Sequence, residues 1–288
     1  MIDFEESFVE KYPQRAFLLK YLHKALKKEH INWEDLTAIN LTKIADYIKS
    51  KVSPNSAINY FGFLKAFLNL MSDDVELPTN KYMTILKSKR LPQQNVALTD
   101  EEIDRIYDYY QTVKHTKNKK TRVEADVLNL FLLECYCGAR GCDTEVFTKD
   151  NIVNDKLTYI SKKTQVLATM PVHYRFLELL KEKTDKKYLN TSKNRILKRV
   201  CKKCGINDQY SLLYRGKMKK APKYEFIGMH SGRRSFASVL SMNGASVPEI
   251  QQFMGHRSME MTMRYIKVDT KNASDAAMAF FKKDKKVN

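Results

Sequence analysis

The sequence has no apolar run long enough to cross a bilayer, and its acidic start, MIDFEESF, lacks the apolar segment of a signal peptide. We therefore expect a cytoplasmic protein that does not insert into membranes. The composition, with 43% hydrophobic and 29% charged residues, also excludes collagen-like and disordered chains. The 288 residues are enough for two domains of ordinary size.

The sequence offers little to hold a metal or a nucleotide. Its five cysteines include one well-spaced pair, Cys201 and Cys204, whereas a structural zinc site uses four ligands, often as two such pairs. We therefore favour reduced thiols in a cytosolic compartment over a zinc site. There is no P-loop pattern and no clear carboxylate cluster, so we expect no cofactor.

Acidic residues are scarce relative to basic ones. Lys and Arg number 51 against 33 Asp and Glu, a net charge of +18, which indicates a polyanionic partner, with nucleic acid first and an anionic membrane surface second. The excess is uneven, because residues 181–223 hold 15 basic and 3 acidic side chains. Apolar residues interrupt this stretch, so we expect a folded face that follows phosphates.

The first part of the chain predicts a small all-helical domain. Apolar residues at helical spacing predict helices over residues 14–29 and 41–52. Ser53 and Pro54 form a suitable N-cap and first turn for a third helix that ends near Asp73. Residues 76–97 then have the composition of a linker.

The second part mixes helices with a hairpin. Thr99 or Asp100 can cap a new helix, and the nearly continuous apolar run at 125–137 predicts a buried one. Two short β-like runs, Leu157–Ser161 and Ala168–Val172, predict a hairpin. From Tyr174 onward the pattern predicts helix almost to the end. No repeat at a solenoid period is present.

Four separated features of the second part carry reactive or cationic side chains. The segment Cys137–Asp143, which contains Arg140, follows the buried helix, and Lys163 stands at the expected hairpin tip. His230-Ser231-Gly232-Arg233 places His and Arg on one face of a helical turn, and Gly255-His256 precedes Tyr265 by nine residues. Each feature alone predicts only a salt bridge, a solvated lysine, a cap or a core tyrosine, but chance explains their order poorly.

This order resembles the tyrosine recombinases, the family of phage integrases and of enzymes that resolve chromosome dimers. The resemblance covers residues 97–288 strongly and 1–90 more loosely. It implies a mainly α fold with a small β-hairpin or sheet (α+β). Residues 1–90 would be a helical, SAM-like core-binding domain, 91–97 a linker and 98–288 the catalytic domain.

The first arginine box of the family is similar to residues 129–152, with Asp143 three residues after Arg140. The stretch ISKKTQVLATMPV resembles the hairpin with the catalytic lysine, which usually stands eight residues before the proline of the next strand. Counting back from Pro171 gives Lys163, with Lys162 as the alternative.

The second box resembles HSGRRSFASVLSMNGASVPEIQQFMGHRSMEMTMRYI, which gives His230, Arg233, His256 and Tyr265. Gly232 stands where the family usually has Leu, and Gly141 and Cys142 are unusual beside Arg140. We expect these departures to loosen local packing without touching the reacting groups.

The resemblance implies a role for each of these residues. Arg140 and Arg233 would clamp the scissile phosphate with forked donors, and His256 would donate one more hydrogen bond to it. Tyr265, a phenol with a pKa near ~10, would form a 3′-phosphotyrosyl link and release a 5′-hydroxyl. Lys163 would be the general acid, and His230 would handle the tyrosyl proton. The phosphotyrosine keeps the bond energy, so neither ATP nor metal is required.

The implied function is site-specific integration, excision or resolution of duplex DNA. A type IB topoisomerase uses the same chemistry, and a catalytically silent DNA-binding protein is a third hypothesis. The early helical domain and short length favour the recombinase, and the presence of every expected reacting residue disfavours the silent protein. The family also implies a DNA-bound tetramer in which a C-terminal helix, here 273–281, passes to the neighbouring protomer.

Overall fold

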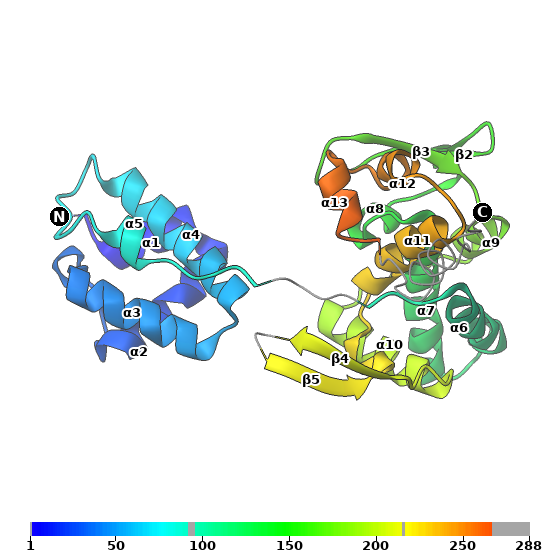
Figure 1. Cartoon of the computed structure of the whole chain (residues 1–288), viewed down its shortest axis with the longest axis horizontal. Helices are drawn as coiled ribbons and strands as arrows, with labels where there is room; N and C mark the ends of the chain where they lie inside the picture. Colours follow the sequence, from blue (N-terminus) through cyan, green and yellow to red (C-terminus); the bar gives the residue numbers. More distant parts are fainter. Residues whose placement is uncertain (1, 92–95, 215–216, 267–288) are drawn as a thin grey trace, which may run out of the picture. The chain divides into compact units, whose positions relative to one another are not determined.

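A computed structural model describes residues 2–91, 96–214 and 217–266. The chain divides into two compact units, one of Met1–Gln94 and Leu212–Lys219, the other of Asn95–Ser211 and Lys220–Asn288. Figure 1 shows the helices and strands of each unit. Much of the expected linker, at 92–95, and the expected C-terminal helix at 273–281 lie outside the described residues. No helix in the described ranges is long and apolar enough to span a membrane.

The first unit is helical, as predicted, and the part of it that the structure describes before residue 92 contains no strand. Side chains of Asp3, Thr37 and Ser53 cap three of its helices by accepting a backbone N–H of the first turn. Its α-helices are α1 (Phe4–Lys11), α2 (Leu19–Leu26), α3 (Ala38–Lys51), α4 (Pro54–Met71) and α5 (Tyr82–Ile85), with 3₁₀ turns at Pro13–Leu18 and Trp33–Asp35.

The core of the first unit is aromatic. Phe4, Phe8, Trp33 and Phe67 are buried, with ring centroids 5.1 to 6.3 Å apart. Tyr82 and Leu86 also lie in this core, so residues 76–90 are part of the folded unit. The expectation of a linker beginning at residue 76 was therefore wrong, because two apolar side chains in that stretch are buried.

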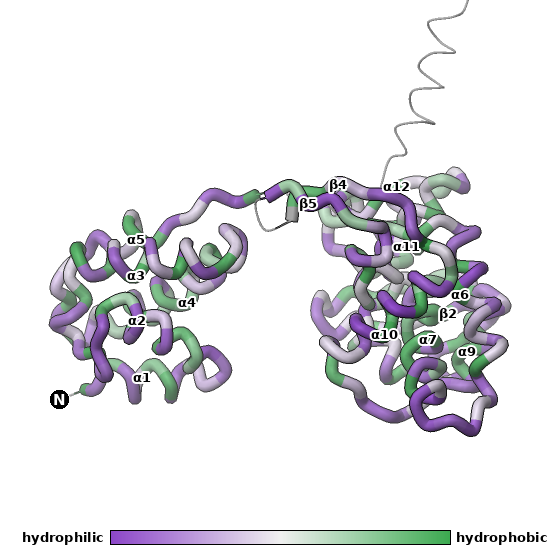
Figure 2. The backbone as a smooth tube through the Cα atoms, turned by 90° about the horizontal axis from the view of Figure 1, so that it is seen from below, coloured by the Kyte–Doolittle hydropathy of each residue, from purple (hydrophilic) through white to green (hydrophobic). Residues whose placement is uncertain are grey.

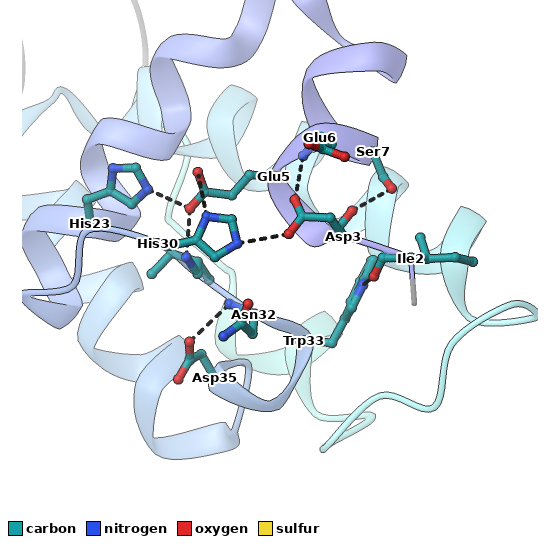
Figure 3. Close-up of polar contacts among 11 residues, drawn as sticks. Ile2, Asp3, Glu5, Glu6, Ser7, His23, His30, Asn32, Trp33 and Asp35 are labelled. Carbon is teal, nitrogen blue, oxygen red and sulfur yellow. Dashed lines mark hydrogen bonds and ion pairs between the residues drawn. The ribbon is translucent and has the colours of Figure 1, made fainter.

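Helix α1 and its N-cap are tied to α2 and the loop after it by paired carboxylates and histidines (Figure 3). Glu5 Oε1 lies 2.6 Å from His23 Nε2 and accepts the backbone N–H of Ile31 at 2.7 Å. Asp3 Oδ2 lies 2.8 Å from His30 Nε2. These contacts join segments about 20 to 30 residues apart and hold the N-terminal helix on the unit.

The second unit is built around one buried helix, α7 (Lys119–Cys137), which packs against α6 (Asp100–Val113). Every residue of α7 from 124 to 137 is buried, and Figure 2 shows hydrophobic segments of its tube among the surrounding helices. Helix α6 has the predicted cap, a capping box between Thr99 and Glu102. The other helices are α8 (Gly141–Thr144), α9 (Tyr174–Lys181), α10 (Asn190–Lys203), α11 (His230–Met242), α12 (Val247–Met254) and α13 (Met259–Met263), with 3₁₀ turns at Lys149–Asn151 and Lys223–Phe226.

Two small antiparallel sheets complete the second half of the chain. The predicted hairpin is present as β2 (Lys156–Ile160) and β3 (Leu167–Pro171), with Thr158 opposite Thr169, and β1 (Ile152–Val153) extends it. Strands β4 (Gln209–Tyr214) and β5 (Lys217–Pro222) form the second sheet. The mainly α fold with a small sheet is thus confirmed.

The expectation of helix from Tyr174 almost to the end was wrong at residues 209–214 and 217–222, which are strands. Helix α10 stops at Lys203, and Gly205 takes a left-handed backbone conformation with φ of 71°. The segment that follows, QYSLLY, is rich in aromatic and aliphatic residues that suit a strand. The lysines of β5 concealed the change from a helical pattern to the alternating pattern of strands.

The basic stretch 181–223 is partly neutralised within the fold. Lys193 pairs with Glu145 at 3.0 Å, and Lys203 pairs with Glu124 at 3.2 Å. Lys223 is buried against Glu102, 2.5 Å away. The stretch therefore contributes fewer charges to an anionic partner than its composition suggests, and the exposed ones include Lys217 and Lys220 on β5.

Candidate active site

Arg140 is presented by the end of the buried helix α7. Gly138 ends that helix in the left-handed conformation with φ of 62°, where a Cβ atom would lie 2.2 Å from the ring of Phe236. Arg140 follows in an extended conformation and donates from Nη1 to Ser161 Oγ at 2.7 Å. Its side chain is partly exposed, so its remaining donors can face a ligand.

Arg233 comes from α11 and is 0% exposed. Nη1 donates to the Gly138 carbonyl at 2.6 Å, and Nη2 donates to the Met254 carbonyl at 2.8 Å. Nε has no hydrogen-bond partner among the described residues, and no ion pair to Arg233 is found there. Burial and the nearby charge of Arg140 lower the pKa of Arg233. The fold thus holds a guanidinium in place while leaving its charge largely uncompensated, which is costly unless an anion completes the site.

His256 lies against Arg233. It follows Gly255, which ends α12 with φ of 58°, and its Nε2 lies 2.6 Å from Arg233 Nη2. Burial, followed by the charges of Arg233 and Arg140, lowers the pKa of His256 to about 3. The neutral ring therefore accepts from Arg233 at Nε2, and Nδ1 donates to Thr262 Oγ1 at 2.9 Å. In this arrangement His256 orients Arg233, and its Nε2 is already engaged.

Tyr265 follows α13 and meets His230, the first residue of α11. The two side chains are hydrogen-bonded, with 2.9 Å between Tyr265 Oη and His230 Nε2. Desolvation and the positive charges of Arg234, Arg233, Arg140 and Lys163 lower the pKa of His230 to about 4. A neutral imidazole can accept the tyrosyl proton. The tyrosine ring also lies 5.0 Å from the ring of His256 and 5.6 Å from Arg233 Cζ.

Lys163 lies in the turn between β2 and β3, with an exposed side chain. It is near enough to His230 for its charge to affect the pKa of that ring. Lys162, the alternative, is exposed as well. The structure therefore brings Arg233, His256, His230 and Tyr265 together through contacts and places Arg140 and Lys163 within electrostatic range of this group.

The space left by Gly141 and Gly232 is filled by Glu134. A Cβ atom at Gly141 would lie 3.0 Å from Glu134 Oε1, and one at Gly232 would lie 3.0 Å from Glu134 Cβ. These two departures from the family pattern therefore do not loosen the packing as expected. Glu134 is 3% exposed, and desolvation raises its pKa to about 8, opposed by the charges of Lys193 and Arg233.

We expect Glu134 to make stability fall as pH rises. The folded state binds its proton more tightly than the unfolded chain, so the stabilisation is fully present below about pH 4.5 and is lost as pH rises through about 8. The loss should be on the order of a few kcal/mol. Urea unfolding from pH 5 to 9 should show this decline, and Glu134→Gln should flatten it. Asp108→Asn, a change at an exposed carboxylate of the same unit, is the control, and a wild-type slope in Glu134→Gln would contradict the assignment.

Several residues that contact or surround the predicted site residues were not predicted from the sequence. Ser161, Thr164, Thr262 and Glu134 contact or face the predicted groups but belong to no recognisable pattern. Asp143 was noted only for its position after Arg140, and the structure places its buried carboxylate beside Ser161 and the Lys162 backbone. Only a contact across the fold identifies such residues.

Known proteins are similar to this chain in sequence and in fold. Residues 96–272 match the model of the phage integrase family, which is more than half of the chain. The chain belongs to the phage integrase family. This tyrosine recombinase is 23% identical over 264 residues to a probable integrase/recombinase of Acholeplasma phage L2, across 89% of this chain and 86% of that protein. It is 27% identical over 219 residues to the tyrosine recombinase XerC of Rickettsia bellii strain RML369-C, across 74% and 69% of the two chains.

Solved structures show the same fold for the tyrosine recombinase. A lambda integrase dimer bound to a COC′ core site superposes with a TM-score of 0.64 at 17% identity, over 92% of this chain and 77% of that one. XerH bound to a palindromic difH substrate gives 0.62 at 15% identity, over 95% and 80%. The chain is a site-specific recombinase, an enzyme that cleaves and rejoins DNA.

Proposed function

We propose that the chain breaks and rejoins duplex DNA through a 3′-phosphotyrosyl intermediate formed on Tyr265. The observation that carries this proposal is the buried guanidinium of Arg233, which has an unpartnered Nε and lies 5.6 Å from the ring of a tyrosine hydrogen-bonded to a neutral histidine. A phosphate diester would supply the missing anion, and Tyr265 would supply the nucleophile.

In the proposed reaction, each bond change is accompanied by one proton transfer to or from a named side chain. Tyr265 Oη attacks phosphorus while His230 Nε2 takes its proton, and the bond to the 5′ oxygen breaks as Lys163 gives that oxygen a proton. Arg140 and Arg233 stabilise the charge that develops on the non-bridging oxygens, and His256 keeps Arg233 in position. Rejoining reverses these steps with the 5′-hydroxyl of the partner strand.

Residues 1–90 would form the core-binding domain, 91–97 the linker and 98–288 the catalytic domain. A groove of about 500 Å³ on the first unit supports its role in DNA binding. Lys51 Nζ lies 5.4 Å from the centroid of the Tyr47 ring, and Lys20 and Lys24 stand one turn apart on α2. Lysines around partly exposed aromatic rings suit a phosphate backbone. The groove is lined by Phe17, Lys20, Tyr21, Lys24, Tyr47 and Lys51.

The double variant Lys20→Ala/Lys24→Ala should raise the Kd for a 30-base-pair duplex by about tenfold or more at physiological salt, because two phosphate contacts are lost. The slope of log affinity against log salt should become shallower by about two. Fluorescence anisotropy at several salt concentrations measures both. Lys11→Ala/Lys81→Ala makes the same charge change at two exposed lysines outside the groove, and an equal loss in both doubles would contradict this face.

The partners would be a specific duplex site and three further copies of the chain. A lambda integrase tetramer bound to a Holliday junction has the same fold, with a TM-score of 0.61, and this supports an assembly of that kind. The enzyme would act in the cytoplasm, on the nucleoid.

The decisive experiment uses a nicked suicide duplex that contains the DNA flanking the gene. Covalent attachment to the 3′ end, mapped by mass spectrometry to Tyr265, is the expected result. Relaxation of plasmids that lack any particular site would indicate a topoisomerase instead. Binding without an adduct would indicate a silent DNA-binding protein.

A further inference from the structure

Lys163 is exposed, but the chain on both sides of it is fastened to the site. The backbone N–H of Lys162 donates to Asp143 Oδ1 at 3.0 Å. On the other side Thr164 is buried, and its Oγ1 donates to the Gly255 carbonyl at 3.0 Å. The peptide that carries Lys163 is therefore held at two points and does not move freely.

Ser161 connects one of these points to Arg140. It is 0% exposed, and its hydroxyl accepts from Arg140 Nη1 at 2.7 Å and donates to Asp143 Oδ2 at 3.2 Å. The same carboxylate holds the Lys162 N–H, so a continuous chain of hydrogen bonds runs from Arg140 to the peptide beside Lys163. A hydroxyl has one proton, and here it is committed to Asp143.

Thr164 connects the other point to His256. Gly255, whose carbonyl Thr164 holds, is the residue before His256. Arg257, the residue after His256, donates from Nε to the Thr164 carbonyl at 2.9 Å. The hairpin tip therefore has two fixed contacts with the segment that carries His256.

We infer that Ser161 and Thr164 are positioning residues that set Lys163 relative to the phosphate clamp. Ser161 fixes the position of the hairpin relative to Arg140, and Thr164 fixes it relative to the segment that carries His256. The inference rests on the proposed role of Lys163 as the acid that protonates the 5′ oxygen. It makes the lysine a group held near the leaving oxygen by neutral hydroxyls that do not themselves react.

The test compares single-turnover cleavage of two nicked duplexes at saturating protein. One has the natural 5′ oxygen at the scissile phosphate, and the other has a 5′-bridging sulfur. A thiolate leaves without protonation because a thiol pKa is near ~8.5. Thr164→Val should cleave the oxygen duplex about tenfold to a hundredfold more slowly and the sulfur duplex at nearly the wild-type rate. Thr169→Val makes the same change on the opposite side of the hairpin, away from its tip, and should leave both rates unchanged.

Ser161→Ala should slow both duplexes, with the larger loss on oxygen, because it releases Arg140 as well as the lysine. Equal losses on the two duplexes for Thr164→Val, or no loss at all, would overturn the inference. So would a wild-type rate for Ser161→Ala on oxygen. Thermal melting confirms that each variant is folded.

Two lysine variants separate this inference from the proposed function. Lys163→Ala should cleave the oxygen duplex slowly and the sulfur duplex at nearly the wild-type rate. Lys162→Ala should cleave both duplexes at the wild-type rate. If sulfur does not restore Lys163→Ala, the assignment of the acid is wrong. If sulfur restores Lys163→Ala while Thr164→Val behaves like wild type, the acid stands and only the positioning role fails.

Discussion

Tyr265→Phe is expected to bind duplex DNA with wild-type affinity and to form no covalent protein–DNA adduct. The ring contacts with His256 and with Arg233 need no hydroxyl, so the variant should keep the packing of the site. Only the Oη atom, 2.9 Å from His230 Nε2, is lost. Gel electrophoresis under denaturing conditions, with a labelled suicide duplex, measures the adduct, and anisotropy measures binding.

Tyr159→Phe is the matched control for this prediction. Its hydroxyl is buried near Arg233 and has no hydrogen-bond partner among the described residues, so removing it costs no contact. We expect normal adduct formation from this variant. An adduct formed by Tyr265→Phe would show that another residue is the nucleophile.

The second large effect is expected at the phosphate clamp. Removing one fixed donor to a developing oxyanion lowers rates by about 10²–10³ in other enzymes, and loss of a charged fork should cost at least as much. Arg140→Ala and Arg233→Ala should each lower cleavage by several orders of magnitude, while DNA affinity falls less because many other phosphate contacts remain. Single-turnover cleavage and equilibrium binding on one duplex separate these two effects.

The two arginines differ in what else they hold. Arg233 also donates to the carbonyls of Gly138 and Met254, so Arg233→Ala should unfold more easily. Among the described residues, the Arg140 side chain donates only to Ser161. Arg140→Ala is therefore the cleaner test of the clamp. Arg264→Ala, next to the nucleophile but exposed and paired with Glu260, is the control. Near-normal cleavage by a folded Arg140→Ala would remove that arginine from the site.

Local chemistry explains which parts of the fold were predictable. Ser53 and Thr99 cap helices because their hydroxyls suit first-turn N–H groups, and this depends on a few neighbouring residues. The apolar run at 125–137 fixed the buried helix in the same way. Strand β5 was missed because its lysines obscure the period of two, and β4 was missed with it although its residues suit a strand.

The site was predictable only where its residues belong to a recognisable order. Arg140, Arg233 and Tyr265 could be proposed because their segments resemble the boxes of a known family. Ser161 could not, because a serine 21 residues after the arginine it accepts from carries no signal in sequence. The close packing of Glu134 against Gly141 and Gly232 could not be predicted either. These residues come together only when α7 packs against α11.

The order of the site residues along the chain has a consequence for synthesis. Arg140, Lys163, Arg233 and His256 all precede Tyr265, and the contact between Arg233 and the Gly138 carbonyl spans 95 residues. A ribosome therefore makes Tyr265, the proposed nucleophile, after the other proposed site residues. Contacts of such long separation form late in folding. Under the proposed mechanism, a nascent chain that stops short of Tyr265 cannot break a DNA strand, so the capacity to cut would appear only after the other groups of the site have been made.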